Sequence, residues 1–223
     1  MSRLNTPLPL QKTTSSQIEA KKQAPSPTLR RSLREQRKGI STAQREQFDR
    51  SINQSLLKSG ILLRSSSIAS YLANDGEPSV NLIIQTCATI KRTHYLPVLK
   101  KHSLQFVRYS WGDELINNSF NIAEPLTTEK LPPKLLSTIL IPLVGFDREG
   151  HRLGMGGGYY DRTLNFMLQK SCQKKPLLIG VGYSLQKVNH IQAQPWDVPL
   201  DAIVTECGLA CFSTKAQSLL HGF

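Results

Sequence analysis

The chain has 223 residues, of which 39% are hydrophobic, so it can bury the core of one domain and still carry a tail. Its 28 Lys and Arg residues exceed its 16 Asp and Glu residues, and the net charge of +12 makes RNA binding one hypothesis. No apolar run is long enough to span a bilayer and the N-terminus lacks the apolar centre of a secretion signal, so we expect neither a membrane protein nor a secreted one.

The four cysteines indicate a reducing compartment. Cys87, Cys172, Cys207 and Cys211 match neither a disulfide framework nor a paired zinc motif. We interpret them as ordinary thiols and expect a cytoplasmic protein.

The positive charge is concentrated at the N-terminus. Residues 1–38 hold nine Lys or Arg and two Glu, a net +7 out of the total of +12. Residues 1–26 are rich in Ser, Thr, Gln, Pro and Lys, and we expect them to form a disordered basic tail. Such a tail is compatible with weak binding to acidic surfaces, with an organelle transit peptide or with a solvated extension. We expect a single domain over residues 27–212 and a short C-terminal tail over residues 213–223.

Two helices are predicted at the start of the domain, over residues 28–38 and 41–60. In the first, Arg30 and Arg34 are one helical turn apart and share a face. Two guanidinium groups in this arrangement can clamp a phosphate or a carboxylate. From spacing alone, a solvated basic face is the more common explanation.

From residue 67 onward, predicted strands alternate with predicted helices. The strands are 67–72, 93–98, 104–109, 138–144, 177–183 and 201–205, and the helices are 80–87 and 160–168. The second and third strands are joined by a short polar turn, which predicts an antiparallel hairpin. The alternation predicts an α/β fold with a mostly parallel sheet covered on both faces. In such sheets ligands bind at the carboxyl ends of the strands.

The most informative segment lies between the strand at 138–144 and the helix at 160–168. Residues 151–162 read His-Arg-Leu-Gly-Met-Gly-Gly-Gly-Tyr-Tyr-Asp-Arg, with four glycines between Gly154 and Gly158. A glycine cluster lets backbone approach a ligand with its N–H groups free to bind an anion, above all a phosphate. The segment lacks the Lys-Ser/Thr of a P-loop and the spacing of the dinucleotide fingerprint. A flexible surface loop is the alternative.

Three acidic residues are candidates for the same site. Asp161 directly follows the glycines, and Mg²⁺ prefers one or two carboxylates plus phosphate oxygens, although Asp161 could instead cap the following helix. Asp197 precedes the strand at 201–205 and matters as a second carboxylate. Glu77 follows the first strand, where it could accept hydrogen bonds from an amino-heterocycle or be an ordinary acidic loop residue. The histidines lack metal-ligand spacing, and no nucleophile elbow is present.

Together these segments resemble the 5-formyltetrahydrofolate cyclo-ligase family, also called methenyltetrahydrofolate synthetase. Residues 30–34, 71–77, 142–147, 152–161 and 196–206 carry the resemblance, which covers about residues 28–208 in the right order. The glycine segment is its most specific part. The resemblance implies a three-layer α/β/α fold that is doubly wound (NagB/RpiA/CoA-transferase-like), with a mostly parallel sheet and a short antiparallel hairpin.

The resemblance implies an enzyme that depends on ATP and Mg²⁺. ATP phosphorylates the formyl oxygen of 5-formyltetrahydrofolate, the neighbouring folate nitrogen attacks the activated carbon, and phosphate leaves to give 5,10-methenyltetrahydrofolate and ADP. The implied partners are small molecules, a reduced folate and ATP. We expect a monomer with neither a membrane nor a specific nucleic acid as partner. The alternatives are a basic-tailed RNA-binding α/β protein and a phosphosugar isomerase-like enzyme on a related fold.

The resemblance also implies roles for residues by position. The implied ATP contacts are Arg30, Arg31, Ser32, Leu33, Arg34, Arg152, Leu153, Gly154, Met155, Gly156, Gly157, Gly158, Tyr159 and Tyr160. The implied folate contacts are Arg34, Leu72, Glu77, Phe120, Met155, Gly156, Gly157, Gly158 and Tyr159. The implied Mg²⁺ ligands are Asp161 and Asp197.

The chain departs from the family pattern at several of these positions. Many members have Lys in place of Arg30, and some carry Arg and Lys where this loop has Met155 and Gly157. Residues 78–80 replace an acidic or polar pair ending in Thr, and residues 194–195 stand where an acidic residue often precedes the second metal-binding Asp.

These departures change where the positive charge of the site should come from. Because the glycine segment contains no lysine, we expect Arg34 and Arg152 to supply that charge. The basic helix at 28–38 should then lie over the nucleotide.

Overall fold

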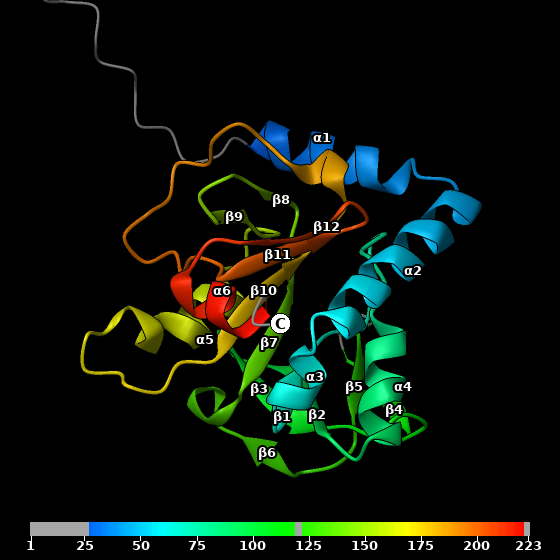
Figure 1. Cartoon of the computed structure of the whole chain (residues 1–223), viewed down its shortest axis with the longest axis vertical. Coiled ribbons are helices and arrows are strands. Elements are labelled where there is room, and N and C mark those ends of the chain that lie inside the picture. The colour runs from blue at the N-terminus through cyan, green and yellow to red at the C-terminus, as the bar shows by residue number, and fades with distance from the viewer. Residues whose placement is uncertain (1–26, 119–121, 221–223) are drawn as a thin grey trace, which may run out of the picture.

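The computed structural model describes residues 27–118 and 122–220. The predicted tail over residues 1–26 and the predicted folate contact Phe120 lie outside the described residues. An eight-stranded sheet runs through the molecule in the order β12-β11-β10-β7-β1-β2-β3-β6 (Figure 1). Its strands are β1 (Ser67–Ala69), β2 (Thr93–Lys100), β3 (Ser103–Arg108), β6 (Lys130–Leu131), β7 (Thr138–Pro142), β10 (Leu177–Val181), β11 (Ala202–Thr205) and β12 (Gly208–Cys211).

The strands from β11 to β2 are parallel to one another, whereas β12, β3 and β6 pair antiparallel at the edges. This arrangement confirms the predicted α/β class, its mostly parallel sheet and the hairpin formed by β2 and β3. The central strands β7 and β10 consist mainly of buried, branched apolar residues. That composition is typical of parallel strands covered on both faces.

Helices cover both faces of the sheet. They are α1 (Pro27–Lys38), α2 (Thr42–Lys58), α3 (Ile61–Arg64), α4 (Asn81–Thr89), α5 (Tyr159–Leu164) and α6 (Thr214–Leu220). On one face Ile52 of α2 and Ile83 of α4 are fully buried in the same cluster as Leu140 of β7. On the other face Leu164 of α5 packs against Ile139 of β7. The three-layer arrangement is therefore as predicted.

α1 lies at the edge where β7 ends. Its Leu33 is buried against Val144, Leu153 and Ile191. A Cβ atom on Gly145 would lie 2.9 Å from Leu33 Cδ1, so a glycine at this position allows the helix to approach closely. Figure 1 shows α1 beside the short hairpin of β8 (Gly145–Phe146) and β9 (Arg152–Leu153). The basic helix is thus anchored at the carboxyl edge of the sheet.

Several predicted elements are shorter or more divided than expected. The strands predicted over 138–144 and 177–183 end at Pro142 and Val181. The strand predicted over 67–72 ends at Ala69, because Tyr71 turns away and its hydroxyl donates to the carbonyl oxygen of Pro78 at 2.8 Å. The helix predicted over 160–168 consists of α5 and a separate 3₁₀ turn, η2 (Asn165–Leu168).

Several short elements have no counterpart among the predictions. β4 (Leu115–Asn117) pairs with β5 (Ala123–Pro125), and two further 3₁₀ turns are η1 (Pro133–Leu135) and η3 (Ser184–Gln186). Residues 213–223, which the sequence sets apart as a tail, contain α6. Its Ala216 and Leu220 are buried in the core, so the packed domain extends at least to residue 220.

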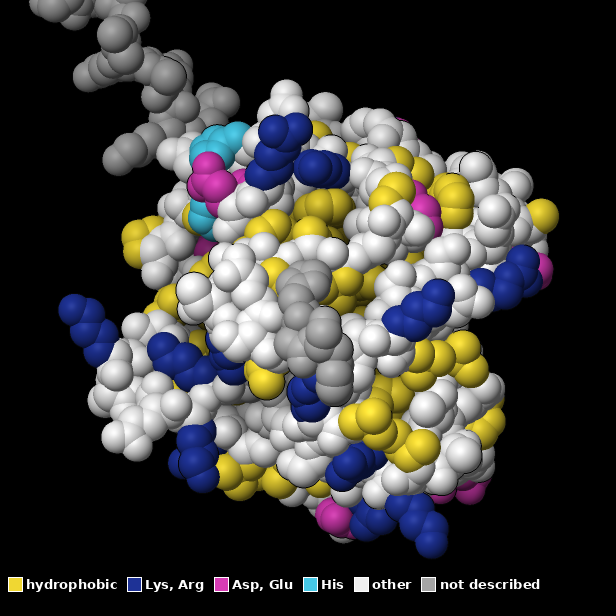
Figure 2. Space-filling view, in the orientation of Figure 1, with side chains coloured by type: hydrophobic (Ala, Val, Ile, Leu, Met, Phe, Trp, Pro, Cys, Tyr) yellow, Lys and Arg dark blue, Asp and Glu magenta, His cyan; other side chains and the backbone are white. Residues whose placement is uncertain are grey.

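In the part of the chain that the structure describes, no helix has both the length and the apolar character needed to cross a membrane. The space-filling view in Figure 2 shows Lys and Arg side chains distributed over this face rather than gathered in one patch. This face therefore shows no basic patch of the kind that RNA binding would require.

Candidate active site

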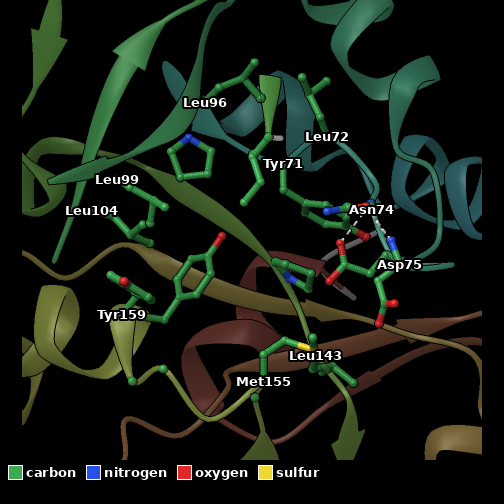
Figure 3. A pocket seen from close by; sticks show the side chains of 18 of the residues that line it. Tyr71, Leu72, Asn74, Asp75, Leu96, Leu99, Leu104, Leu143, Met155 and Tyr159 are labelled. Carbon is green, nitrogen blue, oxygen red and sulfur yellow. Dashed lines mark hydrogen bonds between the residues drawn. The ribbon is translucent and has the colours of Figure 1, made fainter. Parts of the chain in front are cut away.

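A cavity of about 380 Å³ lies at the carboxyl ends of β1, β2 and β7. Its walls come from the loop after β1, from β2, from the end of β7 and from the segment that runs from β9 into α5. This is the position at which a parallel sheet is expected to bind its ligand. Figure 3 shows Leu72 and Leu96 on one side, Leu143 and Met155 on the opposite side, and an open space between them. The walls are mainly apolar and suit a flat organic ligand.

The glycine segment forms an exposed loop along one side of this cavity. Gly154, Gly157 and Gly158 line it, as do Met155 and Tyr159. Gly156 and Gly158 have φ angles of 102° and 64°, which favour glycine because they lie in the left-handed region. A Cβ atom on Gly156 would meet no heavy atom within 4 Å. The backbone of this loop is therefore accessible, as a phosphate-binding loop requires.

α1 reaches the glycine loop through one arginine. Arg30 Nε donates to the carbonyl oxygen of Gly154 at 3.1 Å. Arg31 and Ser32 are exposed, and Arg31 pairs with Glu35 at 2.8 Å. Leu33 has a packing role in the core. Of the predicted ATP contacts on this helix, the structure brings Arg30 to the loop and leaves Arg31, Ser32 and Leu33 outside the cavity wall.

Arg34 belongs to a second cluster, which surrounds Asp75 at the cavity wall. Arg34 Nε lies 2.7 Å and Arg37 Nη2 lies 3.0 Å from Asp75 Oδ2, and Lys38 pairs with the other carboxylate oxygen. The hydrogen bond from Arg34 and the nearby positive charges hold the pKa of Asp75 well below its usual range. Asp75 adopts a φ of 52°. Three cations thus fix one carboxylate in an otherwise unfavourable backbone conformation.

Arg37 is the best-buried member of this cluster. Its side chain is fully buried, and it donates to the carbonyl oxygens of Leu143 at 3.1 Å and of Asp75 at 2.9 Å. It therefore joins the end of β7 to the loop after β1. The predicted site residues include neither Arg37 nor Asp75. The available signal was weak, because Arg37 is one of several arginines on a basic helix and Asp75 belongs to an Asn-Asp-Gly turn.

Glu77 lies in the cavity wall close to two tyrosines. Burial raises the pKa of Glu77 to about 7, although the positive charge of Arg37 acts in the opposite direction. Glu77 Oε2 accepts a hydrogen bond from the backbone N–H of Asn74 at 3.2 Å. Burial and the nearby Glu77 also raise the pKa of the Tyr71 and Tyr160 hydroxyls. Near neutral pH this carboxyl group can therefore either donate or accept hydrogen bonds in an apolar setting.

Asp161 is held by an arginine and by the loop that contains Asp197. The Arg152 side chain, only 5% exposed, pairs with Asp161 Oδ1 and also donates to the carbonyl oxygen of Val198. The N–H of Val198 donates to the same Asp161 oxygen at 3.4 Å. Asp197 caps its own turn, because its Oδ2 accepts from the N–H of Gln194 at 2.8 Å. The structure thus brings Asp161 next to the residue that follows Asp197, while Asp197 itself lies outside the cavity wall.

The cavity gathers ten of the residues implicated by the sequence. They are Leu72, Glu77, Arg152, Gly154, Met155, Gly157, Gly158, Tyr159, Tyr160 and Asp161. Leu153 and Gly156 flank it without lining it. The wall residues that were not anticipated are mostly apolar and include Tyr71, Leu96, Leu99, Leu104 and Leu143. Their spacing is that of ordinary core residues, so the sequence carries no separate signal for them. No group of three or more His, Cys, Asp or Glu residues able to hold a metal occurs within the described ranges.

Comparison with known proteins gives one consistent result. The model of the 5-formyltetrahydrofolate cyclo-ligase family matches residues 21–206. The 5-formyltetrahydrofolate cyclo-ligase of Haemophilus influenzae is 37% identical over 177 residues, which cover 77% of this chain and 92% of that protein. The Escherichia coli K12 protein of the same name is 32% identical over 178 residues, which cover 78% and 96% of the two chains. The solved structure of Aquifex aeolicus 5,10-methenyltetrahydrofolate synthetase matches with a TM-score of 0.73 and 28% identity, covering 83% of this chain and 91% of that chain.

Proposed function

This chain belongs to the 5-formyltetrahydrofolate cyclo-ligase family, and we propose that it uses ATP and Mg²⁺ to convert 5-formyltetrahydrofolate into 5,10-methenyltetrahydrofolate. One observation carries the proposal: a single cavity combines an exposed glycine loop, broad apolar walls and a half-buried carboxyl group. The loop suits the phosphates of a nucleotide. The walls suit the flat rings of a folate, and Glu77 suits the N–H groups at the edge of its pterin.

The proposed reaction is a phosphoryl transfer followed by ring closure. The formyl oxygen attacks the γ-phosphorus of ATP, and ADP leaves with the electrons of the broken P–O bond. The neighbouring folate nitrogen then attacks the formyl carbon and loses its proton, and the C–O bond breaks as phosphate leaves. Neither step requires a nucleophile from the protein. The enzyme has to align the reacting atoms and neutralise the charge of the transferred group.

We assign the phosphates to the backbone N–H groups of residues 154–158. Arg30 and Arg152 supply positive charge on either side of that loop, since one contacts Gly154 and the other lines the cavity. Arg34 is bound to Asp75, so its contribution is electrostatic unless it exchanges that carboxylate for the nucleotide. This assignment places α1 over the nucleotide.

We assign the folate to the apolar part of the cavity. Leu72 packs along the pterin, and Glu77 accepts hydrogen bonds from its amino group and ring N–H. The value of about 7 for the Glu77 pKa means that this group can be ionised when substrate binds. Tyr159, which lies on the opposite side of the cavity from Asn74 and Asp75 in Figure 3, is then near the remainder of the folate.

We assign Mg²⁺ to Asp161 and Asp197, whose carboxylates fit such a role. Within the described part of the chain, recorded hydrogen bonds engage only Oδ1 of Asp161 and only Oδ2 of Asp197. One remaining oxygen from each carboxylate, together with phosphate oxygens, is a donor set that Mg²⁺ accepts. When bound, the ion neutralises charge on the phosphates. Mn²⁺ binding to the protein–ADP complex, followed by water proton relaxation, should weaken when either aspartate is changed to asparagine.

The decisive test is spectroscopic. The protein is incubated with 5-formyltetrahydrofolate, Mg²⁺ and ATP, and the absorbance of the methenyl product is followed. We expect a signal that requires both ATP and Mg²⁺ and that is accompanied by one ADP for each methenyl group formed. Matched reactions lack ATP or contain a chelator. Absence of an ATP-dependent signal would overturn the proposed function.

A further inference from the structure

Two arginines flank the glycine loop and make different contacts. Residues 153–161 contain neither Lys nor Arg, so Arg152 and Arg162 are the nearest cations in the sequence before and after the loop. Arg162 is exposed, and its guanidinium donates to the backbone carbonyl oxygens of His102 and Gly157. Arg152 lines the cavity, and only 5% of its side chain is exposed. Its guanidinium contacts a carboxylate, which gives it a different task.

Arg152 closes a three-residue ring around one oxygen of Asp161. Its Nη2 pairs with Asp161 Oδ1, and its Nη1 donates to the carbonyl oxygen of Val198. The N–H of Val198 donates to the same Asp161 Oδ1 at 3.4 Å. Both donors thus converge on Oδ1, and no hydrogen bond recorded for the described residues engages Oδ2. The ring therefore orients the carboxylate so that its other oxygen is available to a ligand.

Both partners of this ion pair are held in place by the fold. Arg152 is paired with Phe146 across the hairpin of β8 and β9, and the next residue, Leu153, is buried against Leu33 of α1. Asp161 lies in the first turn of α5. The contact between guanidinium and carboxylate is therefore formed before a ligand arrives.

This contact changes the charge that the proposed metal site presents. Asp161 and Asp197 carry two negative charges, and among the ion pairs recorded for the described residues Arg152 is the cation that engages this pair of carboxylates. Its guanidinium cancels one of the two charges. A divalent cation at Asp161 Oδ2 would lie beside this guanidinium, and their repulsion opposes binding. Phosphates reverse the balance, because their negative charge attracts both cations.

We propose that Arg152 couples metal binding to nucleotide binding: it prevents the free site from taking up a divalent cation and admits the metal together with the phosphates. This inference rests on the proposed function, because that proposal makes Asp161 and Asp197 the metal ligands. Arg152 acts on the metal through Asp161 and is in this role a positioning residue. Its removal should therefore have opposite effects on metal binding without nucleotide and on nucleotide binding with metal.

The test measures two affinities, neither of which requires turnover. Electron paramagnetic resonance of unbound Mn²⁺ gives the affinity of the nucleotide-free protein for Mn²⁺, and calorimetry gives the affinity for ADP in excess Mn²⁺. In Arg152→Gln, which keeps an N–H donor, we expect Mn²⁺ to bind on the order of ten-fold more tightly at low salt and ADP to bind on the order of ten-fold more weakly. Structural damage would weaken both. Unchanged or weaker Mn²⁺ binding would overturn the proposal.

Two further variants show whether the charge acts at this carboxylate. Arg152→Lys keeps the charge and should bind Mn²⁺ as weakly as wild type. In Arg152→Gln/Asp161→Asn the gain in Mn²⁺ affinity should disappear. A gain that occurs in Arg152→Lys, or one that persists in the double variant, would contradict the coupling. Wild type alone provides a check that needs no substitution, because equal Mn²⁺ affinities with and without ADP would also overturn it.

Arg162→Gln is the matched control. It removes the same charge next to Asp161 in the sequence, but from a guanidinium that contacts backbone oxygens, so the Mn²⁺ affinity of the nucleotide-free protein should stay close to the wild-type value. An equal gain in Arg152→Gln and Arg162→Gln would mean a general effect of charge and would overturn the proposal. Failure of the proposed function is distinguishable. In that case no methenyl product forms, whereas failure of the coupling alone leaves the product and removes the opposite changes in affinity.

Discussion

Two loops face each other across the cavity and are held in opposite ways. In the loop at 74–79, Asp75 is bound by three cations. The carbonyl oxygens of Gly76, Pro78 and Ser79 each accept a hydrogen bond from a side chain elsewhere in the chain. In the glycine loop at 154–158, residues 154–157 are exposed, and side chains reach the loop mainly at its ends, through Arg30 and Arg162.

This difference separates two tasks within one site. The loop at 74–79 has its shape determined by the protein before any ligand arrives, whereas the glycine loop keeps its backbone groups available for one. Substitutions in and around the loop at 74–79 should therefore mainly reduce the stability of the fold. Substitutions in the glycine loop should mainly weaken the binding of ATP.

The largest effect on stability should come from Arg37. In Arg37→Met, the carbonyl oxygens of Leu143 and Asp75 lose a buried donor, and we expect a loss of about 3 kcal/mol in the free energy of unfolding. Urea unfolding measures this loss. Arg31→Met is the matched control, because Arg31 is exposed on the same helix and its ion pair recorded among the described residues is with Glu35. It should leave the unfolding midpoint unchanged. Equal midpoints for the two variants would contradict the role given to Arg37.

The largest effect on activity without loss of the fold should come from Asp161. Asp161→Asn removes the partner of Arg152 and the proposed metal ligand next to the glycine loop. We expect kcat/KM to fall by roughly 100-fold, equivalent to about 2.7 kcal/mol of transition-state stabilisation, with little change in unfolding. Glu114→Gln, a change at an exposed acid outside the cavity, should leave kcat/KM at the wild-type value. Near-normal turnover of Asp161→Asn would remove that residue from the site.

Glu77 and Asp75 should give opposite dependences of stability on pH. Burial raises the pKa of Glu77 from 4.5 to about 7, so the folded state holds a proton that the unfolded state releases between these values. The stability from this group is complete below pH 4.5, falls as pH rises to about 7 and is then constant. Glu77→Gln should therefore be more stable than wild type by about 1–2 kcal/mol at pH 8. Thermal unfolding at pH 4 and pH 8 measures the change.

Asp75 provides the comparison for that experiment. Its pKa is lowered, first by the hydrogen bond from Arg34, so its stabilisation is present above the usual carboxyl range and is lost as pH falls below it. Asp75→Asn should be less stable than wild type at pH 6, and the difference should shrink toward pH 2. If the stability of both variants relative to wild type changes in the same direction as pH rises, the predicted contrast between the two carboxyl groups is wrong.

The hairpin of β2 and β3 and the helix α4 could be predicted because their pattern is local. The hairpin consists of two apolar segments joined by a short polar turn, and apolar residues recur at helical spacing in α4. The ends of β1 could not be predicted, since they depend on the hydrogen bond from Tyr71 to Pro78, which is set by the folded loop. α6 is short, and its burial depends on α3 and the rest of the core.

The same division applies to the site. The glycine loop could be recognised because the residues that form it, 154–158, are consecutive in the sequence. The role of Arg37 was not, because its partners Asp75 and Leu143 are 38 and 106 residues away and nothing in the local pattern distinguishes it from a solvated arginine. Leu96, Leu99 and Leu104 have core spacing, and only the tertiary arrangement turns them toward a cavity.

The smallest effects should come from a matched pair of glycine substitutions, one in each loop. Gly76 and Gly156 have φ angles of 78° and 102°, so alanine is strained at both and should cost about 1 kcal/mol at each. A Cβ on Gly76 would lie 3.3 Å from Arg45 Nη1, whereas a Cβ on Gly156 would meet nothing within 4 Å. Gly76→Ala should therefore lose more stability in urea unfolding than Gly156→Ala does, because it disturbs Arg45, which donates a hydrogen bond to the carbonyl oxygen of Gly76.

Gly156→Ala should show its larger effect in the KM for ATP. The added methyl group stands where the protein offers no contact but where a phosphate must approach the backbone closely, so we expect a several-fold increase, corresponding to about 1 kcal/mol of lost binding. The KM for ATP of Gly76→Ala should stay near the wild-type value, because that loop is assigned no phosphate contact. Steady-state kinetics with varied ATP at saturating folate measures both. Equal changes in the two variants would mean that the two loops do not divide stability and nucleotide binding between them.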